Sequence, residues 1–272
     1  MKKVVAALDN SAAAGSVAAA AQSLADVFDA EVEAVHVGED GDRIAAAVAQ
    51  AAELELRRLE GPVVPALAHA AAHPDAVALV VGARGLPGRR EIGSTALDVI
   101  TSVSRPVVVV PPDPRKTGPL ERVLVPLEGT PVTSLAPREL IRLADDANVE
   151  ILVVHVHDAA SLPAFTDQPQ HEADAWREEF VARYCRWGIG KVSVHIRVGR
   201  REDEVVGAAV ELDADLVAIG WAQRLAAGRA PVVRELLERG RTPVLLIPMR
   251  LPSRTRNRRR TRSWNSLQSS LG

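Results

Sequence analysis

The chain has very little cysteine, few aromatic residues and no long apolar run. Its 272 residues include one cysteine, Cys185, and only 3% aromatic residues. A single cysteine excludes a disulfide framework and a zinc site built from several cysteines, and it fits a reducing compartment, so we expect a cytoplasmic protein. No apolar run reaches the ~18 residues of a membrane span, so no membrane partner is expected. The amino-terminal run Val4–Leu8 is too short for a secretory signal and is expected to form a buried strand.

Acidic residues are in excess over most of the chain, whereas basic residues are concentrated at its end. Residues 1–112 carry 9 basic and 14 acidic side chains, and residues 113–249 carry 17 and 21. Residues 250–272 carry seven arginines and no acid, and the net charge of the whole chain is −2. The acidic body argues against nucleic-acid binding by the folded part. We expect the end to be a disordered basic tail that makes at most a weak, salt-sensitive contact with nucleic acid.

The sequence contains a long internal repeat, in which four short segments recur in the same order at offsets of 119 to 138 residues. A period of this length indicates two duplicated domains and not a solenoid of short repeats. The matched pairs are Val4–Asp9 with Val123–Glu128, Val35–Val37 with Val154–Val156, Val77–Gly82 with Asp215–Gly220, and Pro106–Pro111 with Pro243–Pro248.

Each copy alternates short apolar runs with helix-like stretches. The runs lack polar alternation, as expected for strands that are covered on both faces of a parallel sheet. The first helix is expected at 12–28, with Asn10 and Ser11 as candidate N-caps. The pattern predicts an α/β fold of two tandem doubly wound parallel-sheet domains, Rossmann-like in type. We place domain 1 at 1–112, a proline-rich linker at 113–120, domain 2 at 121–249 and the basic tail at 250–272.

A glycine-rich loop in the first copy follows an apolar run and leads into a predicted helix. It contains Gly82, Gly85 and Gly93, and Ser94 and Thr95 open the helix. In an open α/β sheet, ligands bind beyond the carboxyl ends of the strands, where this loop lies. A helix N-terminus offers free backbone N–H groups to an anion, and glycine lets the backbone approach it. The loop therefore favours phosphate binding, although the same glycines could simply make a tight turn.

These residues resemble the motif of the universal stress protein family, here as a tandem two-domain member. ATP-binding members carry Gly-x2-Gly-x9-Gly-Ser/Thr after the fourth strand and an Asp after the first, and this chain has Gly82, Gly85, Gly93, Ser94 and Asp9. Seven residues separate Gly85 from Gly93, two fewer than in the family pattern. The resemblance covers residues 1–249. It implies a fold like that of the adenine-nucleotide alpha hydrolases and an ATP site, with or without Mg²⁺, in domain 1.

The resemblance also assigns roles to individual residues. Asp9 would hold the ribose or a metal-bound phosphate, although a helix cap is the alternative role for this side chain, and Val37 would contact the adenine through its backbone. Arg84, with Arg89 and Arg90, either neutralises phosphate charge or belongs to a solvated turn. The nucleotide-site residues expected in domain 1 are Asp9, Val37, Gly82, Arg84, Gly85, Gly93, Ser94 and Thr95.

The second copy has lost the motif. Gln223 replaces the second glycine, Arg229 replaces the serine, and Glu128 stands in the place of Asp9. Trp221 directly follows Gly220 and would crowd a phosphate. We therefore expect copy two to be a structural partner. Because family members pair through their last strand, the resemblance implies an internal pseudo-dimer of the two domains, with a homodimer left open.

Other candidate sites are weaker. His155 and His157 lie two apart on one face of a predicted strand, a spacing found in metal sites, but a pair bonded to the backbone is favoured. Cys185 is flanked by arginines that would lower its pKa, although a packed thiol is favoured.

Three functions follow from the sequence. The leading one is an adenine-nucleotide-binding stress protein that acts by binding and signalling and is not an enzyme. The alternatives are a slow ATPase and a nucleotide-free scaffold that acts through protein contacts. The sequence contains no P-loop, and no general base is paired with a plausible nucleophile in the glycine loop, so dedicated catalysis is not expected.

Overall fold

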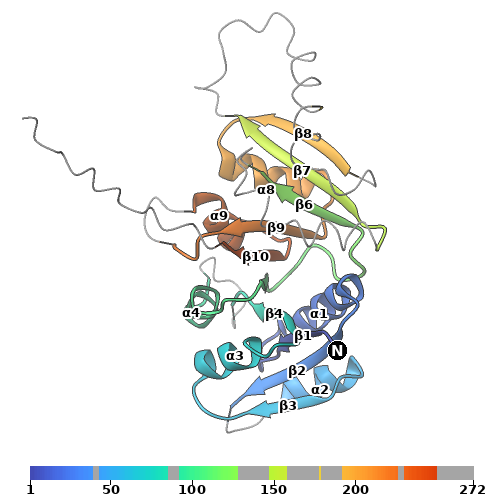
Figure 1. The fold of residues 1–272 in the computed structure, drawn as a ribbon, viewed down its shortest axis with the longest axis vertical. Coiled ribbons are helices and arrows are strands. Elements are labelled where there is room, and N and C mark those ends of the chain that lie inside the picture. Colours follow the sequence, from blue (N-terminus) through green and yellow to red (C-terminus); the bar gives the residue numbers. More distant parts are fainter. Residues whose placement is uncertain are drawn as a thin grey trace, which may run out of the picture.

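Ten strands form one continuous sheet in the computed structural model, which describes residues 1–38, 43–84, 92–127, 147–157, 178, 192–225 and 230–249. The strand order is β3-β2-β1-β4-β5-β10-β9-β6-β7-β8, and the two domains follow one another along the sheet (Figure 1). The strands of domain 1 are β1 (Lys3–Ala7), β2 (Glu31–Val37), β3 (Leu56–Leu59), β4 (Ala76–Gly82) and β5 (Val107–Val110). Those of domain 2 are β6 (Arg122–Pro126), β7 (Glu150–His157), β8 (Val192–Val198), β9 (Leu216–Trp221) and β10 (Val244–Pro248).

The helices of domain 1 cover both faces of its part of the sheet. Val4 and Ala6 of β1 point to the core beneath α1 (Ala14–Phe28) and α2 (Arg43–Ala51), whereas Val5 points to the opposite core. That second core lies beneath α3 (Val63–Ala71) and α4 (Ser94–Ser102). Strands buried on both faces explain the unbroken apolar runs of the sequence. The prediction of a doubly wound α/β fold is confirmed.

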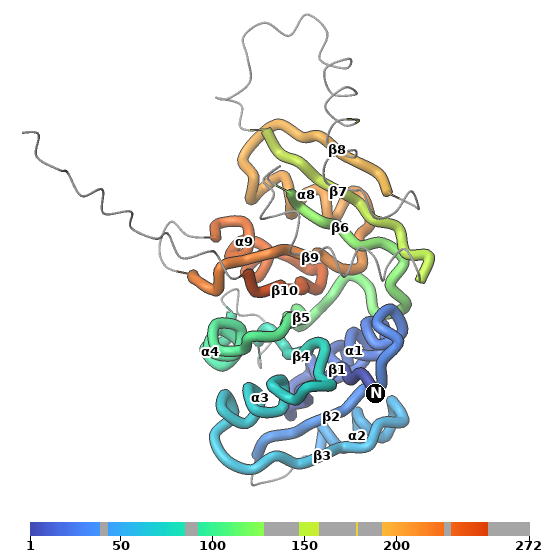
Figure 2. Tube along the Cα trace, in the orientation of Figure 1, coloured from blue at the N-terminus to red at the C-terminus, as the bar shows by residue number. Residues whose placement is uncertain are grey.

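In the parts that the structure describes, domain 2 repeats the strand order of domain 1, with β8-β7-β6-β9-β10 corresponding to β3-β2-β1-β4-β5. Its helices α8 (Arg201–Glu211) and α9 (Pro231–Arg239) belong to the same core as α3 and α4. The tube in Figure 2 follows the chain from domain 1, coloured blue to green, into domain 2, coloured green to red. Several predicted features lie outside the described residues, namely Gly85, Arg89, Arg90, Glu128, Cys185, Arg229 and the basic tail at 250–272.

The two domains join through their last strands. Val108 of β5 is paired with Leu245 of β10 in antiparallel register, whereas every other strand pair of the sheet is parallel. All four valines of β5 are buried, because this strand has become an interior strand of the joint sheet. The prediction of an internal pseudo-dimer is confirmed, and the pairing removes two exposed sheet edges.

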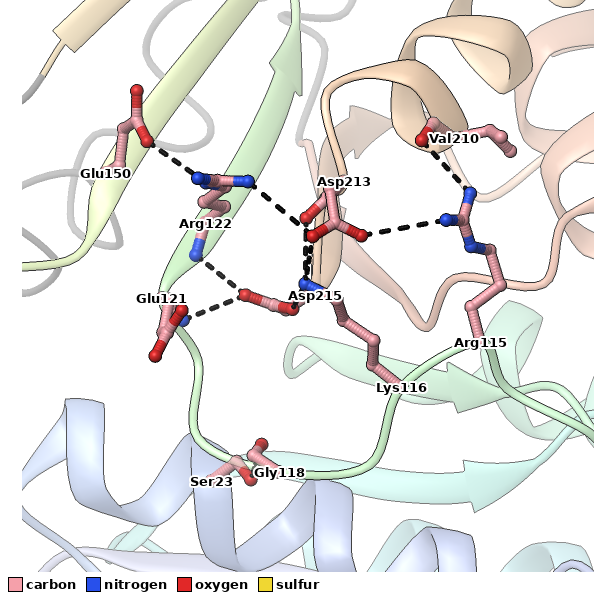
Figure 3. Close-up of polar contacts among 10 residues, drawn as sticks. All are labelled: Ser23, Arg115, Lys116, Gly118, Glu121, Arg122, Glu150, Val210, Asp213 and Asp215. Atoms are coloured by element: carbon pink, nitrogen blue, oxygen red, sulfur yellow. Dashed lines mark hydrogen bonds and ion pairs between the residues drawn. The ribbon is translucent and has the colours of Figure 1, made fainter.

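The linker is fixed to domain 2 by carboxylates that follow α8 (Figure 3). Lys116 contacts Asp213 at 2.6 Å and Asp215 at 3.1 Å. The buried carboxylate of Asp215 also accepts hydrogen bonds from the backbone N–H groups of Glu121 and Arg122. On the opposite side, Ser23 of α1 donates to the carbonyl of Gly118. The linker is thus held by both domains.

Candidate functional site

A cavity of about 330 Å³ opens at the carboxyl ends of β1, β2 and β4 in domain 1. This is the edge at which open α/β sheets bind ligands. The structure brings seven of the eight predicted site residues to its wall, and the eighth, Gly85, lies outside the described residues. The seven are Asp9, Val37, Gly82, Arg84, Gly93, Ser94 and Thr95.

Asp9 is exposed just after the end of β1 and is held in a tight turn. Its Oδ1 atom accepts hydrogen bonds from the backbone N–H of Ser11 at 3.0 Å and from the Ser11 hydroxyl at 2.6 Å. Neither Asp9 nor the predicted Ser11 occupies the N-cap position of α1, which is Ala13. The Ser11 hydroxyl accepts a hydrogen bond from the backbone N–H of Ala13 at 3.2 Å, one residue before the helix begins. The prediction that Asn10 caps this helix is wrong, because Asn10 Oδ1 instead accepts from the first N–H groups of α2, at Ile44 and Ala45.

The strand ends beside Asp9 are held together by His36. This buried side chain has its Nδ1 atom 2.7 Å from the Leu8 carbonyl oxygen, and the Leu8 N–H donates to Val35. A Cβ on Gly38 would lie 3.0 Å from His36 Nε2, so a side chain at position 38 would crowd the ring. The result is a fixed backbone at Val37, where the adenine contact is predicted.

The amino terminus of α4 faces the same cavity. The Gly93 N–H donates to the Ala83 carbonyl at 2.8 Å, which returns the chain to the end of β4 before the helix begins. Gly93 is the N-cap and no side chain caps the helix, while Ser94 and Thr95 are exposed. The first N–H groups of a helix have no partner within it, and they carry partial positive charge. This end can therefore receive an anion.

Arg84 lines the cavity, but its guanidinium reaches across the domain boundary. Its Nη2 atom donates to the carbonyls of Leu237 at 3.1 Å and Glu238 at 2.9 Å. These carbonyls belong to the last turn of α9, where a cation is stabilised by the helix dipole. Arg84, which the sequence suggested as a contact for phosphate, thus caps the carboxyl end of α9 in domain 2.

Gln223 makes the reciprocal contact, which sequence reasoning missed. Its Nε2 atom donates to Val103 at 2.7 Å and to Ile100 at 3.3 Å, at the carboxyl end of α4. Its φ is 53°, in the left-handed region that favours glycine. Gln223 therefore adopts a backbone conformation that suits glycine, and its side chain adds a contact to domain 1. The signal in the sequence was the replacement itself.

The corresponding edge of domain 2 preserves the framework but not the phosphate donors. His155 Nδ1 lies 2.8 Å from the Leu127 carbonyl, just as His36 contacts Leu8. The prediction that His155 and His157 form a backbone-bonded pair is therefore confirmed for His155, whose ring also contacts that of His157 edge to face. Pro231 opens α9 and has no N–H to offer. Trp221 is buried with 3% of its surface exposed. In the described part of the chain, no three His, Cys, Asp or Glu side chains form a cluster suited to a metal ion.

The fold is that of a tandem α/β protein, with a cavity at the strand ends of domain 1. The model of the universal stress protein family matches residues 38–111 and 119–248, and the chain belongs to this family. Among curated proteins, none matches the chain. Within the described residues, no helix is long and apolar enough to cross a membrane.

Solved structures of similar length share the fold. A functionally unknown protein from Pseudomonas aeruginosa PAO1 is 14% identical, with a TM-score of 0.67 over 92% of this chain and 93% of that one. A universal stress protein from Archaeoglobus fulgidus is 15% identical, with a TM-score of 0.63 over 90% of this chain and 98% of that one. These likenesses support the tandem architecture and not a particular ligand.

Proposed function

We propose that domain 1 binds an adenine nucleotide, ATP in the first place, and that the protein acts by binding and signalling in a stress response. The observation that carries the proposal is the convergence of Asp9, Val37 and the uncapped start of α4 on one cavity. A cavity of about 330 Å³ lies within the ~300–1,000 Å³ range of small-molecule sites. The family resemblance of the motif supports the choice of nucleotide.

Different residues of the cavity would hold different parts of the nucleotide. The N–H groups at Ser94 and Thr95, with their hydroxyls, suit the phosphates because they combine hydrogen-bond donors with the positive end of the helix. Asp9 suits the ribose hydroxyls or a phosphate-bound Mg²⁺. The Val37 backbone, fixed by His36, suits the edge of the adenine. The reactive bonds would be the phosphoanhydride bonds of ATP itself. The role of these residues would be to bind and orient the nucleotide.

Binding without turnover is part of the proposal. The described cavity wall contains one carboxylate, Asp9, whose Oδ1 atom is engaged with Ser11. A slow ATPase is the alternative, and steady-state phosphate release from ATP separates the two. A scaffold without nucleotide is the other alternative, and it predicts no heat on titration with ATP, ADP or AMP.

The sharpest test uses the difference between the two domains. Ser94→Pro reproduces the proline of α9 at the start of α4, where it removes one N–H and one hydroxyl. Proline is favoured at the first position of a helix, and Gly93 already has the extended conformation, with φ −65° and ψ 144°, that a following proline requires. We expect calorimetry to show an ATP affinity about tenfold to a hundredfold lower, the scale of a bond to a charged group.

Ser94→Ala is the matched control, because it removes the hydroxyl and keeps the N–H. It should retain most of the affinity that Ser94→Pro loses. Equal ATP affinity in Ser94→Pro and the parent protein would contradict the proposed site.

A further inference from the structure

Domain 2 has its own cavity at the place that corresponds to the nucleotide site of domain 1. Its volume is about 460 Å³, against about 330 Å³ in domain 1. It lies at the carboxyl ends of β6, β7 and β9, and its wall includes Leu127, Val156 and Gly220, the counterparts of Leu8, Val37 and Gly82. The described residues of domain 2 therefore enclose a cavity at this place although the glycine motif is lost.

The wall of this cavity is poorly suited to phosphate. Pro231 and Val232 stand where domain 1 has Ser94 and Thr95, so two hydroxyls and one N–H are missing. The N-cap Ala230 has φ 48° and ψ 52°, a left-handed conformation unlike the extended one of Gly93. The helix therefore begins without the arrangement of donors that suits an anion in domain 1.

The wall of the domain-2 cavity carries larger or more apolar side chains at the corresponding positions. Trp221 replaces Ala83, and Val232 replaces Thr95, while Ile219, Val205 and Met249 complete an apolar wall. Because apolar surface gains free energy when it is removed from water, this wall favours a ligand with an apolar body.

The rim of the cavity is positively charged. Arg201 and Arg224 line it, and its described wall contains no carboxylate. Both arginine side chains are exposed, and neither has an ion-pair partner among the described residues. Their charge is therefore available to a ligand.

The acidic residues nearest to Arg201 along α8 are already paired with other arginines. Glu202 and Asp203 contact Arg200 at 2.7 and 3.5 Å, and Glu204 contacts Arg197 at 3.5 Å. Near Arg224, the loop is held by Arg234, which donates to the Leu225 carbonyl. The charge of Arg201 also acts on Glu202, whose pKa lies below its ordinary value chiefly through a backbone hydrogen bond and Arg200. In the described part of the chain, however, neither Arg201 nor Arg224 forms an ion pair of its own.

We propose that the domain-2 cavity binds an organic carboxylate with an apolar body, such as a fatty or aromatic acid. The apolar wall around Trp221 and Val232 receives the body, and Arg201 and Arg224 receive the carboxylate at the rim. The inference is independent of nucleotide binding in domain 1. It gives the second copy a ligand of its own in addition to its role as a structural partner.

The experiment is a calorimetric titration of the full chain with sodium octanoate, and with octanol as a neutral ligand of the same apolar length. Octanoate should bind at one site per chain and about tenfold or more tighter than octanol, because a bond between two charged groups is added. Replacing both arginines, Arg201→Ala with Arg224→Ala, should remove this advantage and leave octanol binding unchanged. These side chains are exposed, so the fold should be unaffected.

A second pair of variants locates the ligand. Val232→Trp fills the domain-2 cavity and should abolish octanoate binding, whereas the matched Thr95→Trp fills the domain-1 cavity and should leave it unchanged. Both variants retain the arginines of the carboxyl terminus, which therefore cannot account for a difference. Should Val232→Trp fail to fold, the double arginine variant decides the question.

Three results would overturn the proposal: no saturable binding at millimolar octanoate, octanol binding as tight as octanoate, or full octanoate binding in folded Val232→Trp. Failure of the nucleotide site is distinguishable, because it appears as loss of ATP binding with octanoate binding intact.

Discussion

Gln223 of domain 2 donates a hydrogen bond of 2.7 Å to the Val103 carbonyl of domain 1, 120 residues away in the chain. Arg84 of domain 1 makes the equivalent contact in the other direction, to the Glu238 carbonyl of domain 2 at 2.9 Å. Each residue lies just after the strand that precedes the last helix of its own domain, and each caps the last helix of the other. Both contacts join the two domains, in addition to the pairing of β5 with β10.

The first prediction concerns the side chain and the backbone of Gln223 separately. Gln223→Ala removes its two hydrogen bonds and retains the left-handed backbone, so unfolding in urea should show a loss of about 1–3 kcal/mol. Gln223→Gly removes the same bonds but relieves a backbone cost of about 1–2 kcal/mol. It should therefore be the more stable of the two variants. Equal stability of both variants and the parent would mean that the contact to α4 is not formed.

The second prediction concerns Arg84. It decides whether this side chain acts on the end of α9 or on the phosphates of a nucleotide. Arg84→Ala should lower the free energy of unfolding by about 1.5–3 kcal/mol, since it removes a charged donor from the end of α9. Its ATP affinity should fall much less than that of Ser94→Pro. A variant with unchanged stability and abolished ATP binding would show instead that Arg84 acts on the phosphates.

The fold was predictable because its signals are local and repeated. The four matched segments and their unbroken apolar runs indicated strands buried on both faces, and the β5–β10 pairing followed from the family resemblance. The roles of Arg84, Gln223 and Asn10 were not predictable in the same way. Each side chain caps a helix at least 34 residues away, and no periodic pattern marks such a contact.

The third prediction tests the joint sheet. Val108 is paired with Leu245 in the centre of the interface, and both are buried. Val108→Pro removes a backbone donor from an interior strand, where proline is not tolerated. The melting temperature should fall by several degrees, since about 1 kcal/mol corresponds to ~2–4 °C in a chain of this size. An unchanged melting temperature would contradict the pairing.

A fourth prediction concerns pH and the linker. The hydrogen bond from Lys116 lowers the pKa of Asp213 below its ordinary value of 3.8. A carboxylate with a lowered pKa in the folded state contributes stability that is present above its ordinary pKa and is lost as the pH falls through the lowered value. Asp213→Asn should therefore flatten the decline in stability below about pH 4. If stability declined identically below about pH 4 in the two proteins, the contact between Lys116 and Asp213 would not persist in solution.

The central claim is that the start of α4 in domain 1, and not the corresponding start of α9, receives a nucleotide. The most direct measurement is a titration of ATP into the parent protein, Ser94→Pro and Ser94→Ala, with melting curves to establish that all three are folded. The account predicts one ATP site per chain, an affinity about tenfold to a hundredfold lower in Ser94→Pro, and near-parental affinity in Ser94→Ala. No ATP binding by the parent protein, or the same affinity in all three proteins, would contradict it.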